Sequence, residues 1–405
     1  MIQIYKMAWR DLGRNRRRTF FSMLALAVGV ALLLFMASFI AGEMRGALQS
    51  AITLQSGHLQ VRAASYDEDK TSLNFADLVE NPDALAAQIA ARPEVQTATP
   101  RLYATGIVVS GDISAGVRLI GIDPASAASA PFRDGLVSGE YLTADDRTGL
   151  YMGKTLADKL SLAAGDTVTL LVNTSNGDVD QQPFVIRGLY STRTPGYDSS
   201  TVFLPLAKAQ AIARAENHAS LILILLKDQD QTDAVAAALQ SPAYQVQTYI
   251  QLNALLQQFE ELANSYIYLF YLIVLGITAT VIVNTLIMSV FERTREIGIL
   301  ASMGMRGGRI MAMFFAESSL LAVGGVAMGL ALGGLVSAYV QRYGFFIGDM
   351  GITGILLGER IYTYLTLNDA VQLSIMAFVI TLLAALYPAM LAANMEPVEA
   401  LRGNK

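Results

Sequence analysis

The chain has 405 residues, of which 53% are hydrophobic and only 16% are charged, and its net charge is −5. A soluble chain carries about a quarter charged residues, so this composition excludes an ordinary soluble protein. The small net charge argues against a nucleic-acid partner. The absence of cysteine excludes disulfides and thiol catalysis, and two histidines argue against a histidine-based metal site.

Residues 1–18 predict an amphipathic elbow helix on the cytoplasmic face. One face of this helix gathers Ile4, Tyr5, Ala8, Trp9 and Leu12, and the cations are Arg10, Arg14, Arg16, Arg17 and Arg18. This pattern suits a helix on an anionic membrane surface. The alternative is a charge cluster that only sets the topology. Residues 19–42 are uncharged and predict a first membrane span that leaves the cytoplasm.

Residues 43–265 predict a large extracytoplasmic α+β domain in two lobes. The Asn176-Gly177 pair between two strand-like runs indicates a hairpin turn. Apolar stripes at both ends of this segment predict two helices that pair as a stalk. The stripe residues are Leu48 and Ile52 after the first span, and Leu252, Leu255, Leu256 and Phe259 before the second.

The rest of the chain alternates apolar spans with short polar segments. Spans are predicted at 266–291, 310–340 and 370–395, separated by a loop at 292–309 and an outer loop at 341–369, with a tail at 396–405. Arginines in the 292–309 loop predict that this loop lies in the cytoplasm. Because the spans alternate in direction, both termini are then expected in the cytoplasm as well. The predicted fold class is therefore an α-helical integral membrane protein with four transmembrane helices and an α+β extracytoplasmic domain on a helical stalk.

The polar and glycine motifs give few sites for chemistry. The stretch GLYMGKT at 149–155 has one residue too few between its glycines for a phosphate-binding loop, so we expect no nucleotide site, no cofactor and no ATPase activity in this chain. Glu317 lies inside the third span, where it either contacts a proton or substrate or pairs with an arginine of the loop or elbow. The spacing of Gly325, Gly329 and Gly333 predicts close helix packing, within the chain or against a second subunit.

Several stretches resemble the MacB/LolC/LolE/FtsX group of ABC-transporter permeases. These are the loop ERTREIGILASMGMRGGRI, the ending LYPAMLAANMEPVEALRG, the span AESSLLAVGGVAMGLALG and, in the outer domain, MGKTLADKLSLAAGDTVTLL and FVIRGLY. The layout of one span, a large outer domain and three more spans is similar too. The segment equivalent to the long hairpin of LolC-like subunits, VNTSNGDVDQQP, is short here.

This resemblance implies a dimeric permease of the bacterial inner membrane that works by mechanotransmission. A separate cytoplasmic ATPase would use ATP and Mg²⁺ and dock on a coupling helix, with a second permease copy or a homologue, membrane lipids and a periplasmic adaptor or carrier as further partners. The implied coupling residues are Glu292, Arg293, Arg295, Glu296, Ile297, Leu300 and Met303. The implied task is the release or export of a lipoprotein, lipid or other amphipathic molecule. The alternatives are drug or peptide efflux, or an FtsX-like regulator of cell-wall hydrolases that transports nothing.

Overall fold

The computed structural model describes residues 2–14, 16–67, 71–348 and 358–396. The predicted tail at 396–405 and the centre of the predicted outer loop at 341–369 lie outside these residues, apart from residue 396. The chain divides into two compact units. One contains Met1–Met44, Phe259–Phe345 and Ile361–Lys405, and the other contains Arg45–Gln258 and Phe346–Arg360.

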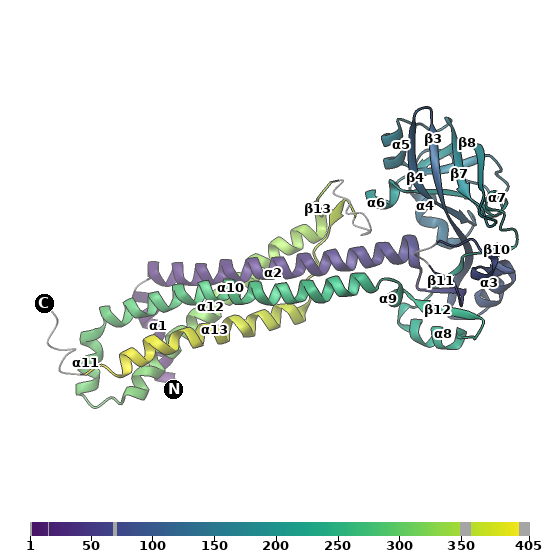
Figure 1. Cartoon of the computed structure of the whole chain (residues 1–405). Coiled ribbons are helices and arrows are strands. Elements are labelled where there is room, and N and C mark those ends of the chain that lie inside the picture. The colour runs from purple at the N-terminus through teal and green to yellow at the C-terminus, as the bar shows by residue number, and fades with distance from the viewer. Residues whose placement is uncertain (1, 15, 68–70, 349–357, 397–405) are drawn as a thin grey trace. The chain divides into compact units, whose positions relative to one another are not determined.

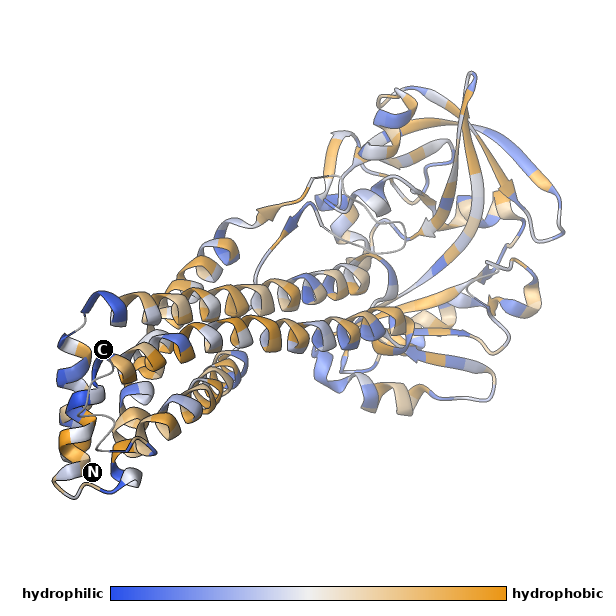
Figure 2. Cartoon of the chain, turned by 60° about the vertical axis from the view of Figure 1, so that its left-hand side comes forward, coloured by the Kyte–Doolittle hydropathy of each residue, from blue (hydrophilic) through white to orange (hydrophobic). Residues whose placement is uncertain are grey.

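The first unit is a bundle of four long helices, labelled in Figure 1: α2 (Arg16–Ala51), α10 (Ala254–Glu292), α12 (Gly307–Tyr343) and α13 (Leu367–Ala393). All four are long and apolar enough to cross a membrane. Even α13, with 27 residues, extends about 40 Å, more than the ~30 Å of a hydrocarbon core. In Figure 2 the ribbons of these helices carry mostly the colour of hydrophobic residues, and hydrophilic residues gather at the end of the bundle that carries the N-terminus. Two short helices, α1 (Ile2–Arg14) and α11 (Thr294–Ser302), belong to the same unit.

Small residues allow α12 to pack closely on α2. A methyl group added at Gly325 would meet Leu26 of α2, one at Gly329 would meet Val30, and one at Gly333 would meet the backbone of Ala31. Ser38 of α2 and Ser337 of α12 also share a buried hydrogen bond of 2.9 Å. The predicted glycine stripe is therefore filled by a helix of the same chain and leaves no room there for a second subunit.

The second unit is built on a mixed sheet with the strand order β12-β1-β11-β3-β4-β9-β6-β8-β5, and β7 pairs with β3 and β8. The strands are β1 (Leu59–Ala63), β3 (Val95–Ser110), β4 (Ile113–Ile122), β5 (Leu136–Gly139), β6 (Gly149–Gly153), β7 (Thr167–Asn173), β8 (Val179–Tyr190), β9 (Thr201–Pro205), β11 (Leu221–Leu226) and β12 (Tyr244–Thr248). A short pair in this unit is formed by β2 (Val79–Glu80) with β10 (His218–Ala219). Another pair, β13 (Phe345–Phe346) with β14 (Arg360–Ile361), has residues assigned to both units.

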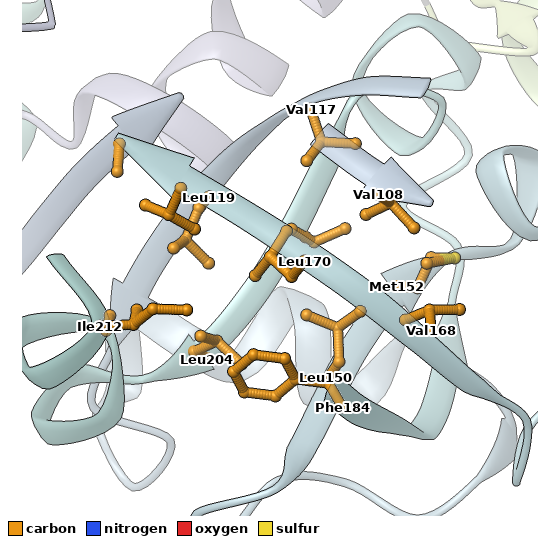
Figure 3. Close-up of a cluster of buried hydrophobic side chains, with 14 of the residues drawn as sticks. Val108, Val117, Leu119, Leu150, Met152, Val168, Leu170, Phe184, Leu204 and Ile212 are labelled. Atoms are coloured by element: carbon orange, nitrogen blue, oxygen red, sulfur yellow. The ribbon is translucent and has the colours of Figure 1, made fainter. Parts of the chain in front are cut away.

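The helices of this unit are short and cover the sheet. They are α3 (Pro82–Ala90), α4 (Ala130–Asp134), α5 (Lys154–Leu160), α6 (Pro195–Asp198), α7 (Leu206–Ala213), α8 (Thr232–Leu239) and α9 (Tyr249–Leu252). The largest apolar core includes Leu119, Leu150, Leu170, Phe184 and Leu204, which Figure 3 shows packed together. A separate core packs α3 and α8 on β1, β11 and β12. Because β3 pairs with β11 over its first half and with β4 over its second, one long strand links the two parts.

Four spanning helices and an α+β outer domain confirm the predicted fold class. The Asn176-Gly177 turn is also confirmed, because β7 and β8 pair antiparallel on either side of it. The stretch GLYMGKT forms no loop: strand β6 runs directly into α5. A methyl group added at Gly153 would collide with the Asp198 carbonyl, so the chain packs closely where the strand meets the helix.

The stalk prediction needs a correction. Leu252 lies in α9 and Leu255 in α10, and Asn253 between them leaves the helical conformation with φ −113° and ψ 35°. The predicted single helix is therefore broken. Ile52 begins a π-helical turn and is buried, but Leu255 is 69% exposed, so the two stripes do not form a closed seam within the chain. Within the part of the chain that the structure describes, this side of α10 stays largely exposed at Leu255.

We expect Gly329→Ala to lower the melting temperature of the detergent-solubilised protein. The added methyl group would overlap Val30 at 2.7 Å and the Ala27 carbonyl at 2.8 Å, and overpacking costs about 1–3 kcal/mol. Gly334→Ala is the matched control because nothing lies within 4 Å of the added methyl group. Both variants gain the same helix propensity. Equal melting temperatures for the two variants would contradict the packing of α12 on α2.

Candidate functional site

Helix α11 is attached tightly to the helices before and after it. Helix α10 ends at Glu292 and α11 begins at Thr294, whose hydroxyl donates to the carbonyls of Val290 and Phe291. After α11 the chain turns at Gly304, which has a φ of +90° that favours glycine. Helix α12 begins at Gly307. The result is a short helix held between two long ones at one end of the bundle (Figure 1).

Arg293 is the centre of a buried ion cluster at this end of the bundle. Its side chain is 8% exposed and contacts three carboxylates: Asp11 at 2.6 Å, Glu296 at 3.2 Å and Glu317 at 3.5 Å. Asp11 comes from α1, Glu296 from α11 and Glu317 from α12. Buried carboxylates are tolerated when a cation pairs with them, so Arg293 fixes three helices to one another.

The ion cluster accounts for the presence of a carboxylate, Glu317, inside the apolar helix α12. Of the two interpretations drawn from the sequence, the structure supports the pairing of Glu317 with an arginine of the loop, Arg293. It also corrects the role expected for Arg293, because a buried side chain that is already paired has no surface to offer a partner protein. Asp11 was missed from the sequence, although it is the first acidic residue of the chain and lies among arginines.

Two more ion pairs join the elbow to the loop. Arg14 contacts Glu296 at 2.8 Å, and Arg18 contacts Glu292 at 2.6 Å. The hydrogen bond from Arg14 lowers the pKa of Glu296, and the hydrogen bond from Arg293 acts in the same direction. Both pairs are largely exposed and each contributes little by itself. Glu292 and Glu296 therefore face α1 and the start of α2.

The remaining predicted coupling residues divide between two faces of α11. Ile297 is buried in an apolar cluster with Val290, Ile310 and Phe314, so it cannot be the exposed anchor that was expected from the sequence. Leu300 is half-buried. Arg295, Ile299 and Met303 are exposed, and Met303 has 72% of its surface free. The helical repeat puts these side chains on opposite sides of α11. Ile297 packs into the apolar core beneath the helix, and the exposed side chains lie on the other side.

A groove of about 450 Å³ lies between α1 and α11. Its walls are Met7, Arg10, Asp11 and Arg14 on one side and Arg293, Glu296, Ile299 and Leu300 on the other. The groove combines apolar side chains with charges of both signs. This composition fits a protein segment with a mixed surface better than a small apolar molecule.

The outer unit has a larger open hollow of about 590 Å³. It is lined by Gln49, Ser50 and Thr53, by the edge strand residues Leu136 and Val137, and by the turn at 191–194. That turn is held by Asp198, which accepts hydrogen bonds from the backbone and hydroxyl of Thr192 and from Ser191. Burial raises the pKa of Asp198 to about 6, although these hydrogen bonds favour its charged form.

The geometry defines a class of protein: a membrane protein with four helices long enough to span a bilayer, a separate α+β domain, and a small polar surface built from α1 and α11 at one end of the helical bundle. Residues 19–241 match the family model of the MacB-like periplasmic core domain, and residues 268–397 match that of the FtsX-like permease C-terminal region. The chain belongs to the MacB/LolC/LolE/FtsX family of ABC-type permeases.

Named relatives extend over almost the whole chain. The lipoprotein-releasing system transmembrane protein LolE of Haemophilus influenzae is 23% identical over 94% of this chain and 93% of its own. LolC of Neisseria meningitidis serogroup B is 24% identical over 95% of this chain and 94% of its own. The macrolide export ATP-binding/permease protein MacB of Shewanella sp. (strain W3-18-1) is 24% identical over 99% of this chain but only 60% of its own length.

We expect Arg293→Met to destabilise the protein strongly. The substitution leaves Asp11 and Glu317 without their shared cation, and breaking a buried pair costs roughly 3–5 kcal/mol. The melting temperature in detergent and the yield of folded protein should both fall. Adding Glu317→Gln to this variant should restore part of the loss, because one uncompensated charge is removed.

Arg295→Met serves as the control, since Arg295 is exposed on the same turn. It should melt like the wild type. If Arg293→Met and Arg295→Met have the same melting temperature, the cluster does not fix the three helices.

Proposed function

We propose that this chain is the permease subunit of an ABC transporter that moves a lipoprotein, lipid or other amphipathic molecule. In this proposal a separate cytoplasmic ATPase binds α11, hydrolyses ATP with Mg²⁺, and drives movements of the outer domain. The chain itself binds neither ATP nor a metal and performs no catalysis. It acts beside a second permease subunit, either another copy or a homologue.

The exposed face of α11 is the observation that carries the proposal. Ile299 and Met303 present apolar side chains next to Arg295, beside the groove shared with α1. An amphipathic helix with exposed apolar residues suits docking into a groove of a partner. Because Arg293 and Ile297 bury the opposite face, a force applied to α11 passes directly into α1 and α12.

Two continuous helices support the transmission of movement. The division between the two units falls inside α2 and inside α10, so each helix runs from the bundle into the outer unit. Helix α2 ends in a π-helical turn whose Leu54 carbonyl accepts hydrogen bonds from the buried Arg101 and from Tyr197. Helix α10 is separated from α9 by the break at Asn253. The hydrogen bonds at Leu54 and the break at Asn253 both lie within the outer unit.

The cargo proposal rests on the names of the relatives. LolE and LolC align with this chain from end to end, and both are lipoprotein-releasing system proteins, which favours an amphipathic cargo. The likeness to the permease part of MacB supports drug or peptide efflux as the alternative. A tight turn joins β7 and β8, so we do not assign a carrier-gripping role to that hairpin. An adaptor would have to contact another part of the outer domain.

The docking proposal predicts that Met303→Asp weakens binding of the ATPase. A charge at a buried anchor of an interface commonly costs about 2 kcal/mol or more, equivalent to at least a tenfold loss of affinity. Pull-down of the ATPase by the solubilised permease measures binding, and stimulation of ATP turnover measures coupling. Glu296→Arg is a poor test because Glu296 pairs with Arg14 and Arg293 within the chain.

The control is Ile113→Asp, which places the same charge on an exposed apolar residue at the tip of the β3–β4 hairpin. It should retain the ATPase at the wild-type level. Normal retention by Met303→Asp would show that α11 is not the docking helix.

Topology gives an independent prediction. The chain has no cysteine, so a single introduced thiol is labelled alone. In intact cells with a permeable outer membrane, Asp112→Cys should react with an impermeant thiol reagent, and Ser302→Cys should react only after the inner membrane is opened. The arginines of the 292–309 loop place that loop inside. Labelling of Ser302→Cys in sealed cells would refute the proposed orientation of the four spans.

A further inference from the structure

Helix α1 presents three different faces. One face holds Ala8, which is fully buried, and the half-buried Leu12, and it packs against the bundle. A second face exposes Tyr5 and Trp9, and a third exposes Lys6 and Arg10. Residues four apart lie above one another on a helix, so these pairs form two parallel stripes, aromatic and cationic, that lie side by side.

This arrangement differs from the single apolar face expected from the sequence. Trp9 was placed with Ala8 and Leu12, yet 69% of its surface is exposed. Tyr5 is 47% exposed. A large aromatic side chain left exposed next to cations is typical of the interface between hydrocarbon and headgroups, where its ring is apolar and its polar edge is wet.

The cations near the N-terminus divide into two groups with different neighbours. Arg14 and Arg18 pair with Glu296 and Glu292 of the same chain. Lys6, Arg10, Arg16 and Arg17 are exposed, and none of them has a carboxylate within 4 Å among the residues that the structure describes, although Arg16 donates a hydrogen bond to the Gly13 carbonyl. The second group therefore carries positive charge that is free to bind an external anion.

The position of α1 in the chain brings this charge to the membrane surface. Helix α1 ends at Arg14, and α2, the first spanning helix, begins at Arg16. Phe20 and Phe21 are exposed at the start of α2, about one turn beyond Arg17 at ~1.5 Å per residue. Apolar rings that follow a cation by one turn place the cation at the level of the headgroups.

We propose that the Tyr5/Trp9 and Lys6/Arg10 stripes of α1, together with Arg17, form a binding surface for anionic phospholipid headgroups of the leaflet on the α1 side of the membrane. The aromatic stripe enters the interface, and the cationic stripe selects negatively charged lipids over zwitterionic ones. Charge complementarity supplies the selectivity, at about a fivefold preference for each basic residue near the surface. Because Asp11 and Arg14 bind Arg293 and Glu296, lipids held by α1 also fix the position of α11.

Trp9 makes this surface directly measurable. It is the one tryptophan of the chain, so all tryptophan fluorescence of the purified permease reports on α1. The permease alone is reconstituted in bilayers of phosphatidylcholine and phosphatidylglycerol in which the acyl chains of only one lipid are brominated near the headgroup. At equal fractions of brominated lipid, we expect stronger quenching by brominated phosphatidylglycerol than by brominated phosphatidylcholine. The ratio should fall with added salt, which screens charges.

The variant Arg10→Gln/Arg17→Gln should lower this quenching ratio towards one while Trp9 stays quenched by both lipids. The control Arg147→Gln/Arg342→Gln removes the same charge from exposed positions elsewhere and should keep the wild-type ratio. Equal quenching by the two lipids in the wild type would overturn the selectivity. No quenching by either lipid would overturn the whole proposal and indicate that protein covers this face. Neither result depends on the docking of an ATPase, because no ATPase is present in the measurement.

Discussion

One guanidinium group holds together the end of the helical bundle. Arg293 reaches Asp11, Glu296 and Glu317, which lie on three different helices. Glu317 and Asp11 lose most of their solvation here, and the shared cation within contact distance offsets that loss, while Glu296 stays partly exposed. Helices α1, α11 and α12 therefore keep their positions together, because separating them would break the ion pairs and expose the charged groups to water. The orientation of α11 and the faces of α1 follow from this constraint.

The burial of this cluster also determines which side chains of α11 and α1 are exposed at this end of the bundle. On α11, Ile297 turns into the core and leaves Ile299 and Met303 outside. On α1, Asp11 turns towards Arg293 and leaves Trp9 and Arg10 outside. The exposed surface of α11 suits a groove on a protein, and the exposed surface of α1 suits a layer of lipid headgroups. Both helices contribute a carboxylate to the cluster around Arg293, so their positions depend on one another.

In the bundle, close approach rather than charge sets the arrangement. Gly325, Gly329 and Gly333 let α12 lie against α2 with backbone atoms in near contact. Dispersion contacts and buried hydrogen bonds such as Ser38 to Ser337 stabilise helix pairs in a membrane, where the hydrophobic effect does not distinguish helix from lipid. The outer unit depends on hydrophobic cores instead, and the long strand β3 belongs to both of its parts. The two units are thus stabilised by different physics, suited to their different solvents.

The sequence by itself determined the class of the protein. Long uncharged runs have one stable solution in a bilayer, the helix, because every backbone group must be hydrogen-bonded internally. The four spans, the α+β outer domain, the Asn176-Gly177 hairpin and the family could therefore be predicted. Local pattern was sufficient in each case, since hydropathy, turn chemistry and motif spacing involve residues close together in the chain.

Only the tertiary structure decided which side chains are exposed and therefore available to contact a partner. Periodicity could place Ile297, Leu300 and Met303 on one helix but could not show that Ile297 is buried against Phe314. It could not foresee that Asp11 captures Arg293 from the other end of the sequence, that Asn253 breaks the second stalk helix, or that α2 fills the glycine stripe. These outcomes depend on contacts between residues far apart in the chain, and burial is a property of the packed neighbours rather than of the residue itself.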